Sequence, residues 1–208
     1  MVKIAVLVSG GGTNLQALLD AQAAGALPDG EIALVVSSNP KAYALERAAG
    51  AGVPTEVVRR RDYADDAAYT AKMTELLDTR GIGLIVLAGF MTVLPDAFCA
   101  HYENRIMNVH PSLIPSFCGE GFYGLHVHEA ALQKGVKVTG ATVHFVCGEV
   151  DGGPIIAQHA VDIAEDDTPE TLQKRVMVEA EWKLLPRAVA DFCAGRLTVA
   201  NGIVRRKA

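Results

Sequence analysis

The sequence has little that would suit a membrane protein, a disulfide scaffold or a nucleic-acid surface. Its apolar runs are all shorter than the roughly 18 residues that a membrane-spanning helix needs. Its four cysteines are scattered without a C-x-x-C pair, which favours reduced thiols and a cytoplasmic protein. Its net charge is −5, and the basic runs at 59–61 and 205–207 are too short to form a stripe for nucleic acid. We therefore expect a globular protein that acts on small molecules, as a monomer or a homodimer.

The chain alternates between short β-branched runs and amphipathic stretches. Strands are predicted at 3–8, 32–36, 55–58, 84–88 and 105–109, with helices at 14–24, 43–51, 66–79 and 95–101. This βαβ series predicts an α/β fold with a doubly wound, mostly parallel sheet. Further strands at 138–146 and 155–161, a short helix at 128–134 and a helical period over 168–194 follow. Asn201-Gly202 then predicts a hairpin, so we expect antiparallel C-terminal strands and one domain over 1–208.

A glycine-rich segment, Ser9-Gly10-Gly11-Gly12-Thr13-Asn14, joins the first predicted strand to the first helix. Free backbone N–H groups and the helix dipole favour an anion at such a junction, and phosphate is the obvious guest. The sequence has Leu15 where a dinucleotide fingerprint needs glycine, and no Gly-Lys-Ser/Thr follows, which counts against NAD and ATP. The segment predicts binding of a smaller phosphate ester. A tight turn capped by Thr13 or Asn14 is the alternative.

Asn108 and His110 lie two apart in a predicted strand, so they face the same space. Pro111 forces His110 into an extended conformation and ends the strand in a stiff loop. Asp151 lies in an Asp-Gly-Gly-Pro turn, where carboxylates are also common as turn formers. If this turn folds over the end of the strand, Asp151 pairs with His110, stabilises the imidazolium and raises its pKa.

Other candidates carry weaker signals. His126 and His128 form an H-x-H that would also suit a hydrolytic metal site with His110 and Asp151, but the preferred interpretation is that no metal is bound. His144 is expected to be a packed core histidine. Glu181, judged from the residues alone, is expected to be a solvated helix charge.

Seven segments, in this order, carry a family resemblance: 9–16, Leu87-Ala88-Gly89-Phe90-Met91, 108–115, Gly124-Leu125-His126-x-His128, Val143-His144-Phe145, Asp151-Gly152-Gly153-Pro154 and the helix with Glu181. Together they resemble the glycinamide ribonucleotide formyltransferase family of de novo purine biosynthesis. The resemblance implies transfer of the formyl group of 10-formyltetrahydrofolate, as co-substrate, to the amine of glycinamide ribonucleotide, without a metal. It implies a phosphate-binding half at 1–110 and a folate-site half at 111–208.

The resemblance also implies roles for individual residues. Asn108, His110 and Asp151 match the catalytic trio, and Asn108 and Asp151 also border the folate. Gly12, Thr13 and Asn14 match the loop that binds the substrate phosphate, and Glu181 matches a carboxylate that contacts the same substrate. The folate-binding positions are Met91, Thr92, Val93 and Leu94, together with Cys147, Gly148, Glu149, Val150 and Asp151.

The sequence departs from the family at two places. Many members carry an arginine near the folate where Asp66 stands, and the loop at 116–124 is longer than the shortest family versions. Two other functions stay open. A formyltetrahydrofolate hydrolase would use similar Asn, His and Asp residues, but is expected to carry an additional N-terminal domain. A non-enzymatic phosphate-ligand-binding module would need the glycine-rich segment but neither Asn108 nor Asp151.

Overall fold

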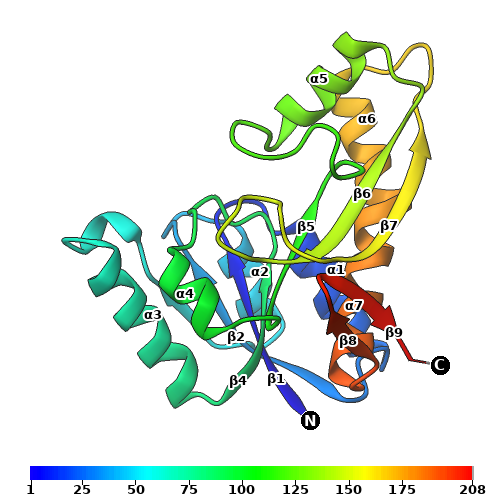
Figure 1. The fold of residues 1–208 in the computed structure, drawn as a ribbon. Helices are drawn as coiled ribbons and strands as arrows, with labels where there is room; N and C mark the ends of the chain where they lie inside the picture. The colour runs from blue at the N-terminus through cyan, green and yellow to red at the C-terminus, as the bar shows by residue number, and fades with distance from the viewer. Residues whose placement is uncertain (208) are drawn as a thin grey trace.

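A computed structural model describes residues 1–207, which form a seven-stranded sheet covered by helices and a small two-stranded sheet near the C-terminus (Figure 1). The strands are β1 (Val2–Val8), β2 (Gly30–Ser37), β3 (Thr55–Val57), β4 (Ile82–Leu87), β5 (Ile106–His110), β6 (Val138–Phe145), β7 (Ile155–Asp162), β8 (Leu197–Ala200) and β9 (Ile203–Arg206). The helices are α1 (Thr13–Ala23), α2 (Ala44–Gly50), α3 (Asp66–Thr79), α4 (Asp96–His101), α5 (Leu125–Lys134), α6 (Pro169–Val176) and α7 (Trp182–Cys193). A 3₁₀ turn, η1 (Arg60–Asp62), and a π-helical turn, η2 (Met177–Glu181), complete the list.

The large sheet has the strand order β3-β2-β1-β4-β5-β6-β7. Strands β1 to β5 pair in parallel, whereas β6 pairs antiparallel with both β5 and β7. The predicted doubly wound sheet with antiparallel C-terminal strands is therefore confirmed, and β8 and β9 form the predicted hairpin. The strand order reverses direction between β1 and β4, and ligands of such sheets bind beyond the carboxyl ends of the strands at that point.

Strand β1 shows why the sheet is buried on both faces. Ile4, Val6 and Val8 pack into the apolar cluster that α1, α2 and α7 cover. Ala5 and Leu7 point the other way, into the cluster beneath α3 and α4. Alternate side chains thus fill two cores, which is the reason that the strand is a continuous apolar run. This rigid centre fixes the position of the loop that follows Val8.

The predicted helix over 168–194 is interrupted in the structure. Thr168 caps α6 with a reciprocal pair of hydrogen bonds to Thr171, as its capping residue type favours. The π turn η2 then separates α6 from α7. In a π turn the backbone hydrogen bonds join residues five apart, instead of the four of an α-helix. The single continuous helix expected from the period is therefore wrong in detail, and the interruption spans Met177–Glu181.

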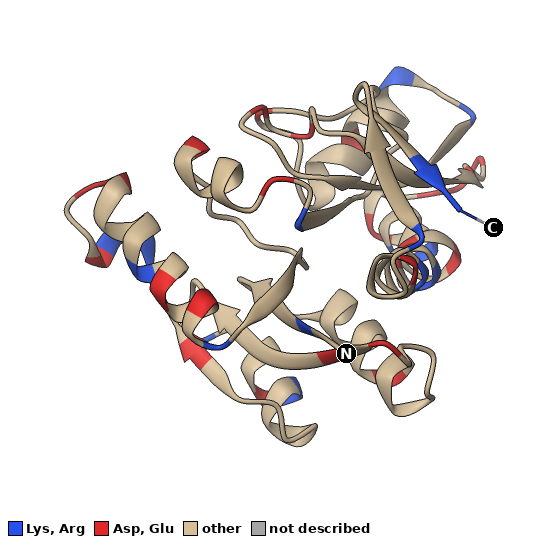
Figure 2. Cartoon of the chain, turned by 60° about the horizontal axis from the view of Figure 1, so that its bottom comes forward, with Lys and Arg blue, Asp and Glu red and all other residues tan. Residues whose placement is uncertain are grey.

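Charge is distributed without a dominant basic surface in the view of Figure 2, where Lys and Arg are scattered over several elements next to Asp and Glu. Among residues 1–207, no helix combines the length and apolar content needed to cross a bilayer.

Candidate active site

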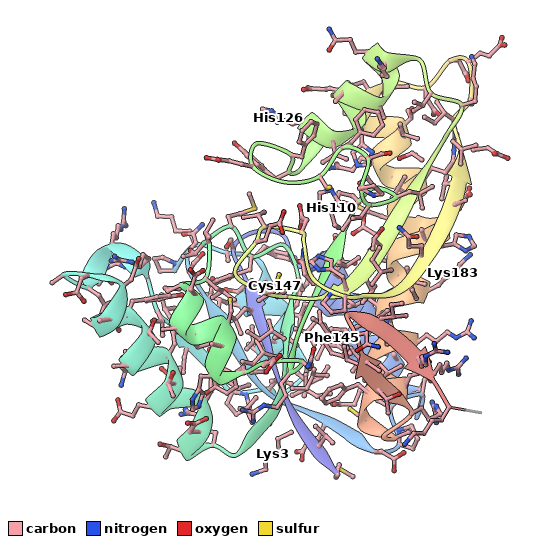
Figure 3. All side chains as sticks on the ribbon, viewed as in Figure 1. Lys3, His110, His126, Phe145, Cys147 and Lys183 are labelled. Atoms are coloured by element: carbon pink, nitrogen blue, oxygen red, sulfur yellow. The ribbon has the colours of Figure 1, made fainter. Side chains whose placement is uncertain are left out.

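A cavity of about 820 Å³ lies at the carboxyl ends of β1, β4 and β5. Two of the lining residues are labelled in Figure 3: His110, at the end of β5, and Cys147, on the loop that follows β6. Every residue that the sequence analysis assigned to the site lines this one cavity. They are Gly12, Thr13 and Asn14 after β1; Met91, Thr92, Val93 and Leu94 after β4; Asn108 and His110 on β5; Cys147, Gly148, Glu149, Val150 and Asp151 between β6 and β7; and Glu181 on η2.

The loop of residues 9–14, named here the glycine loop, leaves the first turn of α1 open. Gly12 is the N-cap with a φ of +73°, and no side chain caps the helix, so the alternative of a turn capped by Thr13 or Asn14 is wrong. A Cβ at Gly12 would lie 2.6 Å from the Cβ of Ala44, so only glycine fits against α2. The N–H groups of the first turn have no partner within the helix, so this helix start is a suitable site for an anion.

Glu181 lies opposite the glycine loop and is only 4% exposed. The Asn14 side-chain amide donates a hydrogen bond of 2.6 Å to its carboxylate. Burial raises the pKa of Glu181 to about 7, and the Asn14 hydrogen bond opposes the rise only in part. The expectation of a solvated charge is wrong, because the π turn rotates this position inward and residue periodicity does not reveal such a turn.

Asn108, His110 and Asp151 converge although Asp151 is distant from the other two along the chain. Asp151 Oδ2 lies 3.4 Å from His110 Nδ1, and Asn108 Nδ2 lies 3.5 Å from Asp151 Oδ1. Asp151 has a φ of +56°, a left-handed conformation that Asp tolerates better than most residues. His110 and Asp151 are named here the acid–base pair, and both side chains are less than a tenth exposed.

Burial lowers the pKa of His110, whereas hydrogen bonds and nearby charge outweigh burial and lower the pKa of Asp151. For His110, burial lowers the pKa below its usual value, and the charge of Asp151 and the Phe117 carbonyl oppose this without reversing it. The expected rise in the pKa of His110 is therefore wrong in sign, although its predicted partner is right. For Asp151, burial favours a higher pKa, but His144, the His110 charge and the Gly119 N–H together hold it below its usual value. The structure thus favours neutral imidazole beside carboxylate.

Two contributors to the site were missed from the sequence. His144 is not merely packed, since its Nε2 lies 3.2 Å from Asn108 Nδ2 and 3.6 Å from Asp151 Oδ1. It reaches them because β6 runs antiparallel to β5 and places His144 directly opposite Asn108. The loop of residues 116–124, named here the covering loop, also touches the acid–base pair through its backbone. A sequence gives neither strand register nor backbone contacts of a loop.

The opposite wall of the cavity is more apolar and more open. Met91 and Val93 are 54% and 72% exposed, Val150 is also exposed, and Leu94 is buried beneath them. The Met91 N–H donates to Ser9 Oγ at 2.8 Å, which ties this wall to the glycine loop. Exposed aliphatic side chains around a cavity suit a flat, partly apolar ligand.

Asp66, which stands where many family members have an arginine, and its neighbour Asp65 both make contacts at the start of α3. Asp65 caps α3 by accepting from the Ala68 N–H, and Asp66 forms an ion pair of 2.6 Å with Arg60. These acidic residues therefore serve the start of α3, and neither lines the large cavity.

The H-x-H falls on α5, where residues two apart face different directions. His126 is exposed and stacks on Tyr123, whereas His128 is fully buried and both its ring nitrogens lack a partner within residues 1–207. The described part of the chain holds no group of three or more His, Cys, Asp or Glu side chains arranged to bind a metal.

Comparison with known proteins fits this geometry. The family model for formyl transferase matches residues 2–189. The chain belongs to the formyl transferase family. The phosphoribosylglycinamide formyltransferase of Haemophilus influenzae is 37% identical over 203 residues, which cover 98% of this chain and 92% of that protein. The crystal structure of glycinamide ribonucleotide transformylase 1 from Symbiobacterium toebii is 43% identical with a TM-score of 0.93, covering 100% of this chain and 95% of that one.

Members of the formyl transferase family differ in length and in the reaction that their names state. The trifunctional purine biosynthetic protein adenosine-3 of Gallus gallus is 42% identical over 96% of this chain, but the chain spans only 19% of its length. A formyltetrahydrofolate deformylase from Pseudomonas syringae is 26% identical with a TM-score of 0.87, and covers 100% of this chain and 66% of its own. Family membership therefore leaves transfer and hydrolysis to be distinguished by the site and by assay.

Proposed function

We propose that the protein transfers the formyl group of 10-formyltetrahydrofolate to the amine of glycinamide ribonucleotide, in purine biosynthesis. The observation that carries the proposal is the single cavity that joins an open helix start, an amide beside the acid–base pair and an apolar wall. The glycine loop would bind the phosphate of the ribonucleotide, and the wall after β4 would hold the folate. Placing both substrates in one cavity removes much of the entropic barrier of a two-substrate reaction.

The reaction needs a hydrogen-bond donor, a proton acceptor and a proton donor. The amine nitrogen attacks the formyl carbon, and the formyl oxygen becomes an oxyanion that the Asn108 amide can stabilise. Loss of one such donor typically lowers the rate by about 10²–10³-fold. The amine proton passes to the acid–base pair and from there to N10 of the folate, as the bond between N10 and the formyl carbon breaks.

The protonation state of the acid–base pair suits the acceptor role. His110 Nε2 donates to the Phe117 carbonyl at 2.8 Å, so the neutral ring carries its proton on Nε2 and leaves Nδ1 free to accept one. The Asp151 carboxylate, 3.4 Å from Nδ1, stabilises the imidazolium that forms. A base that is neutral before the reaction is consistent with the lowered pKa of His110.

The two halves of the chain contribute different parts. Residues 1–110 supply the glycine loop and Asn108, whereas residues 111–208 supply Asp151 and Glu181. Raised to a pKa of about 7 by burial, Glu181 can hold a proton beside a bound phosphate ester and accept or donate a hydrogen bond to its sugar. The substrates are thus small molecules, and no metal is invoked in any step.

Hydrolysis of the same folate is the second candidate, because the deformylase relative shares the fold. Water would replace the amine as nucleophile, and no phosphate ester would be needed. The glycine loop and the buried Glu181 favour transfer, because they build a second substrate site that hydrolysis does not use.

The test is release of tetrahydrofolate by the purified protein, followed spectrophotometrically with and without glycinamide ribonucleotide. Release that depends on the ribonucleotide supports transfer. Release without it would establish hydrolysis instead, and no release would favour a phosphate-binding module.

Variants of the acid–base pair sharpen this assay. His110→Ala and Asp151→Asn should each lower kcat by at least about 10²-fold, because each removes a member of the proton-transfer pair. His126→Ala is the matched control, since His126 is exposed on α5 and outside the cavity. Near-normal turnover in either test variant would exclude its assigned role.

A further inference from the structure

We propose that the backbone of the covering loop sets the protonation of the acid–base pair, with the Phe117 carbonyl and the Gly119 N–H as positioning groups. The inference rests on the proposed formyl transfer. It extends the role of this loop from the Phe117 contact used above to both members of the acid–base pair. Figure 1 shows this loop between β5 and α5, next to the loop that joins β6 to β7.

The covering loop makes one backbone hydrogen bond to each member of the acid–base pair. The Phe117 carbonyl accepts from His110 Nε2 at 2.8 Å, and the Gly119 N–H donates to Asp151 Oδ2 at 2.9 Å. The first contact fixes which ring nitrogen of His110 carries the proton. The second stabilises the ionised form of Asp151 and is among the causes that lower its pKa. One residue of the loop therefore leaves Nδ1 as the free acceptor, and a second helps to keep the Asp151 carboxyl group that faces it ionised.

The loop holds this shape through unusual backbone conformations. Phe117 has a φ of +50°, which is rare for a bulky side chain, and Gly119 and Gly121 have φ values of +89° and +87°. Left-handed conformations of large residues persist where the surroundings enforce them, often at functional sites. Here the enforced conformation is the one that turns the Phe117 carbonyl toward His110.

Further contacts within the loop maintain the conformation independently of the acid–base pair. The rings of Phe117 and Phe122 pack edge to face with centroids 6.4 Å apart. The Phe122 N–H donates to the Gly119 carbonyl at 3.1 Å, and Ser112 Oγ donates to the Ser116 carbonyl at 2.6 Å. The covering loop therefore has a defined conformation of its own, and this conformation places its backbone against the acid–base pair.

Two glycines of the loop provide a matched pair of substitutions. Gly119 and Gly121 have nearly equal positive φ values, and a Cβ at either position meets nothing within 4 Å. A valine is strongly disfavoured at such a φ, so Gly119→Val and Gly121→Val impose the same backbone penalty. Only Gly119 donates its N–H to Asp151.

The experiment measures the pH dependence of kcat/KM for both variants. The acidic limb contains the protonation of both His110 and Asp151. Without its hydrogen bond to Gly119, the Asp151 carboxylate is less stable, so the Asp151 contribution to the limb of Gly119→Val should move upward by about one pH unit. Gly121→Val should keep the acidic limb of the unsubstituted protein, whatever its effect on kcat. Gly119→Asn should restore the limb, because Asn tolerates left-handed backbone.

A second measurement does not depend on turnover. The carboxyl carbon of Asp151, assigned in ¹³C spectra by comparison with Asp151→Asn, should titrate at higher pH in Gly119→Val than in Gly121→Val. Equal shifts in both variants, or none in either, would overturn the proposal. A gain of turnover in Gly119→Val would also overturn it, because the loop would then obstruct the pair. Failure of the proposed function would instead show as absent formyl transfer by the unsubstituted protein while the ¹³C shift persists.

Discussion

Replacing Glu181 by glutamine should change the pH dependence of folding stability by an amount that the structure predicts. Burial raises the pKa of Glu181 from 4.5 to about 7 in the folded protein. Between these values the folded protein keeps a proton that the unfolded chain releases, so its stability falls as the pH rises through this window. One pKa unit corresponds to about 1.4 kcal/mol, so the whole change is about 3 kcal/mol.

Glutamine at position 181 stays neutral at every pH and still offers an oxygen to the Asn14 amide. The free energy of unfolding of Glu181→Gln should therefore exceed that of the unsubstituted protein by about 3 kcal/mol more at pH 8 than at pH 4.5. Urea denaturation at intervals between these pH values measures this difference, because the contributions of all other groups cancel. Glu179→Gln, at an exposed position of the same π turn, should show no comparable trend.

The shape of the curve is the critical observation. A difference between Glu181→Gln and the unsubstituted protein that stays constant from pH 4.5 to 8 would refute the reasoning, because it would mean that Glu181 titrates alike in the folded and unfolded states. A change of opposite sign would mean that the carboxylate is stabilised in the cavity by a positive group. Either result would remove the basis for a protonated Glu181 beside the phosphate site.

Two further stability predictions follow from buried groups. Burial lowers the pKa of His128 from 6.5 to about 4, so stability should fall as the pH drops through this window, and His128→Phe should abolish about 3 kcal/mol of that loss in denaturation at pH 7 and pH 4. An unchanged acid loss in His128→Phe would contradict the assignment. Gly153→Ala should destabilise the fold by more than about 3 kcal/mol, because its Cβ would overlap the carbonyl oxygen of Phe145, whereas Gly152→Ala meets only the flexible side chain of Glu149. Equal melting temperatures for these two glycine variants would show that the turn can move away.

The sheet was predictable because its signals are local. The apolar runs, the helical periods and the Asn201-Gly202 turn each specify an element within a few residues, and the parallel βαβ arrangement follows from their alternation. The position of the glycine loop follows as well, since the first strand must end at the carboxyl edge of the sheet. A local sequence pattern was enough to predict each feature that depends on a single helix, strand or turn.

Contacts between distant segments were predicted less well. His144 contacts Asn108 through the pairing of β5 with β6, and a shift of one residue in that register would turn it to the other face. The inward turn of Glu181 depends on η2, which the helical period does not reveal. In both cases the residue type was visible in the sequence, but its direction depended on tertiary packing.

The direction of the His110 pKa shift shows why knowing the partner of a residue is not enough to predict its protonation state. Asp151 was correctly predicted to face His110, yet burial lowers the pKa of the imidazole despite that partner. Desolvation depends on every group packed around the ring, and it outweighs both the Asp151 charge and the hydrogen bond to the Phe117 carbonyl, which favour a higher pKa. A close pair of residues therefore predicts which charges interact, and only the complete packing predicts which protonation state results.

The same balance distinguishes Glu181 from Asp151, two of the acidic residues that line the cavity. Glu181 has one amide donor and is fully enclosed, so burial dominates and raises its pKa to about 7. Asp151 is buried too, but His144, His110 and the Gly119 N–H face its oxygens, so its pKa is lowered. Environments that move two carboxyl groups in opposite directions assign them different roles. A carboxyl that can stay protonated avoids repelling an anion at the glycine loop, whereas a carboxylate beside His110 is needed to stabilise the imidazolium. The proposed transfer requires this division, because it places the substrate phosphate at the glycine loop and the proton transfer at the acid–base pair.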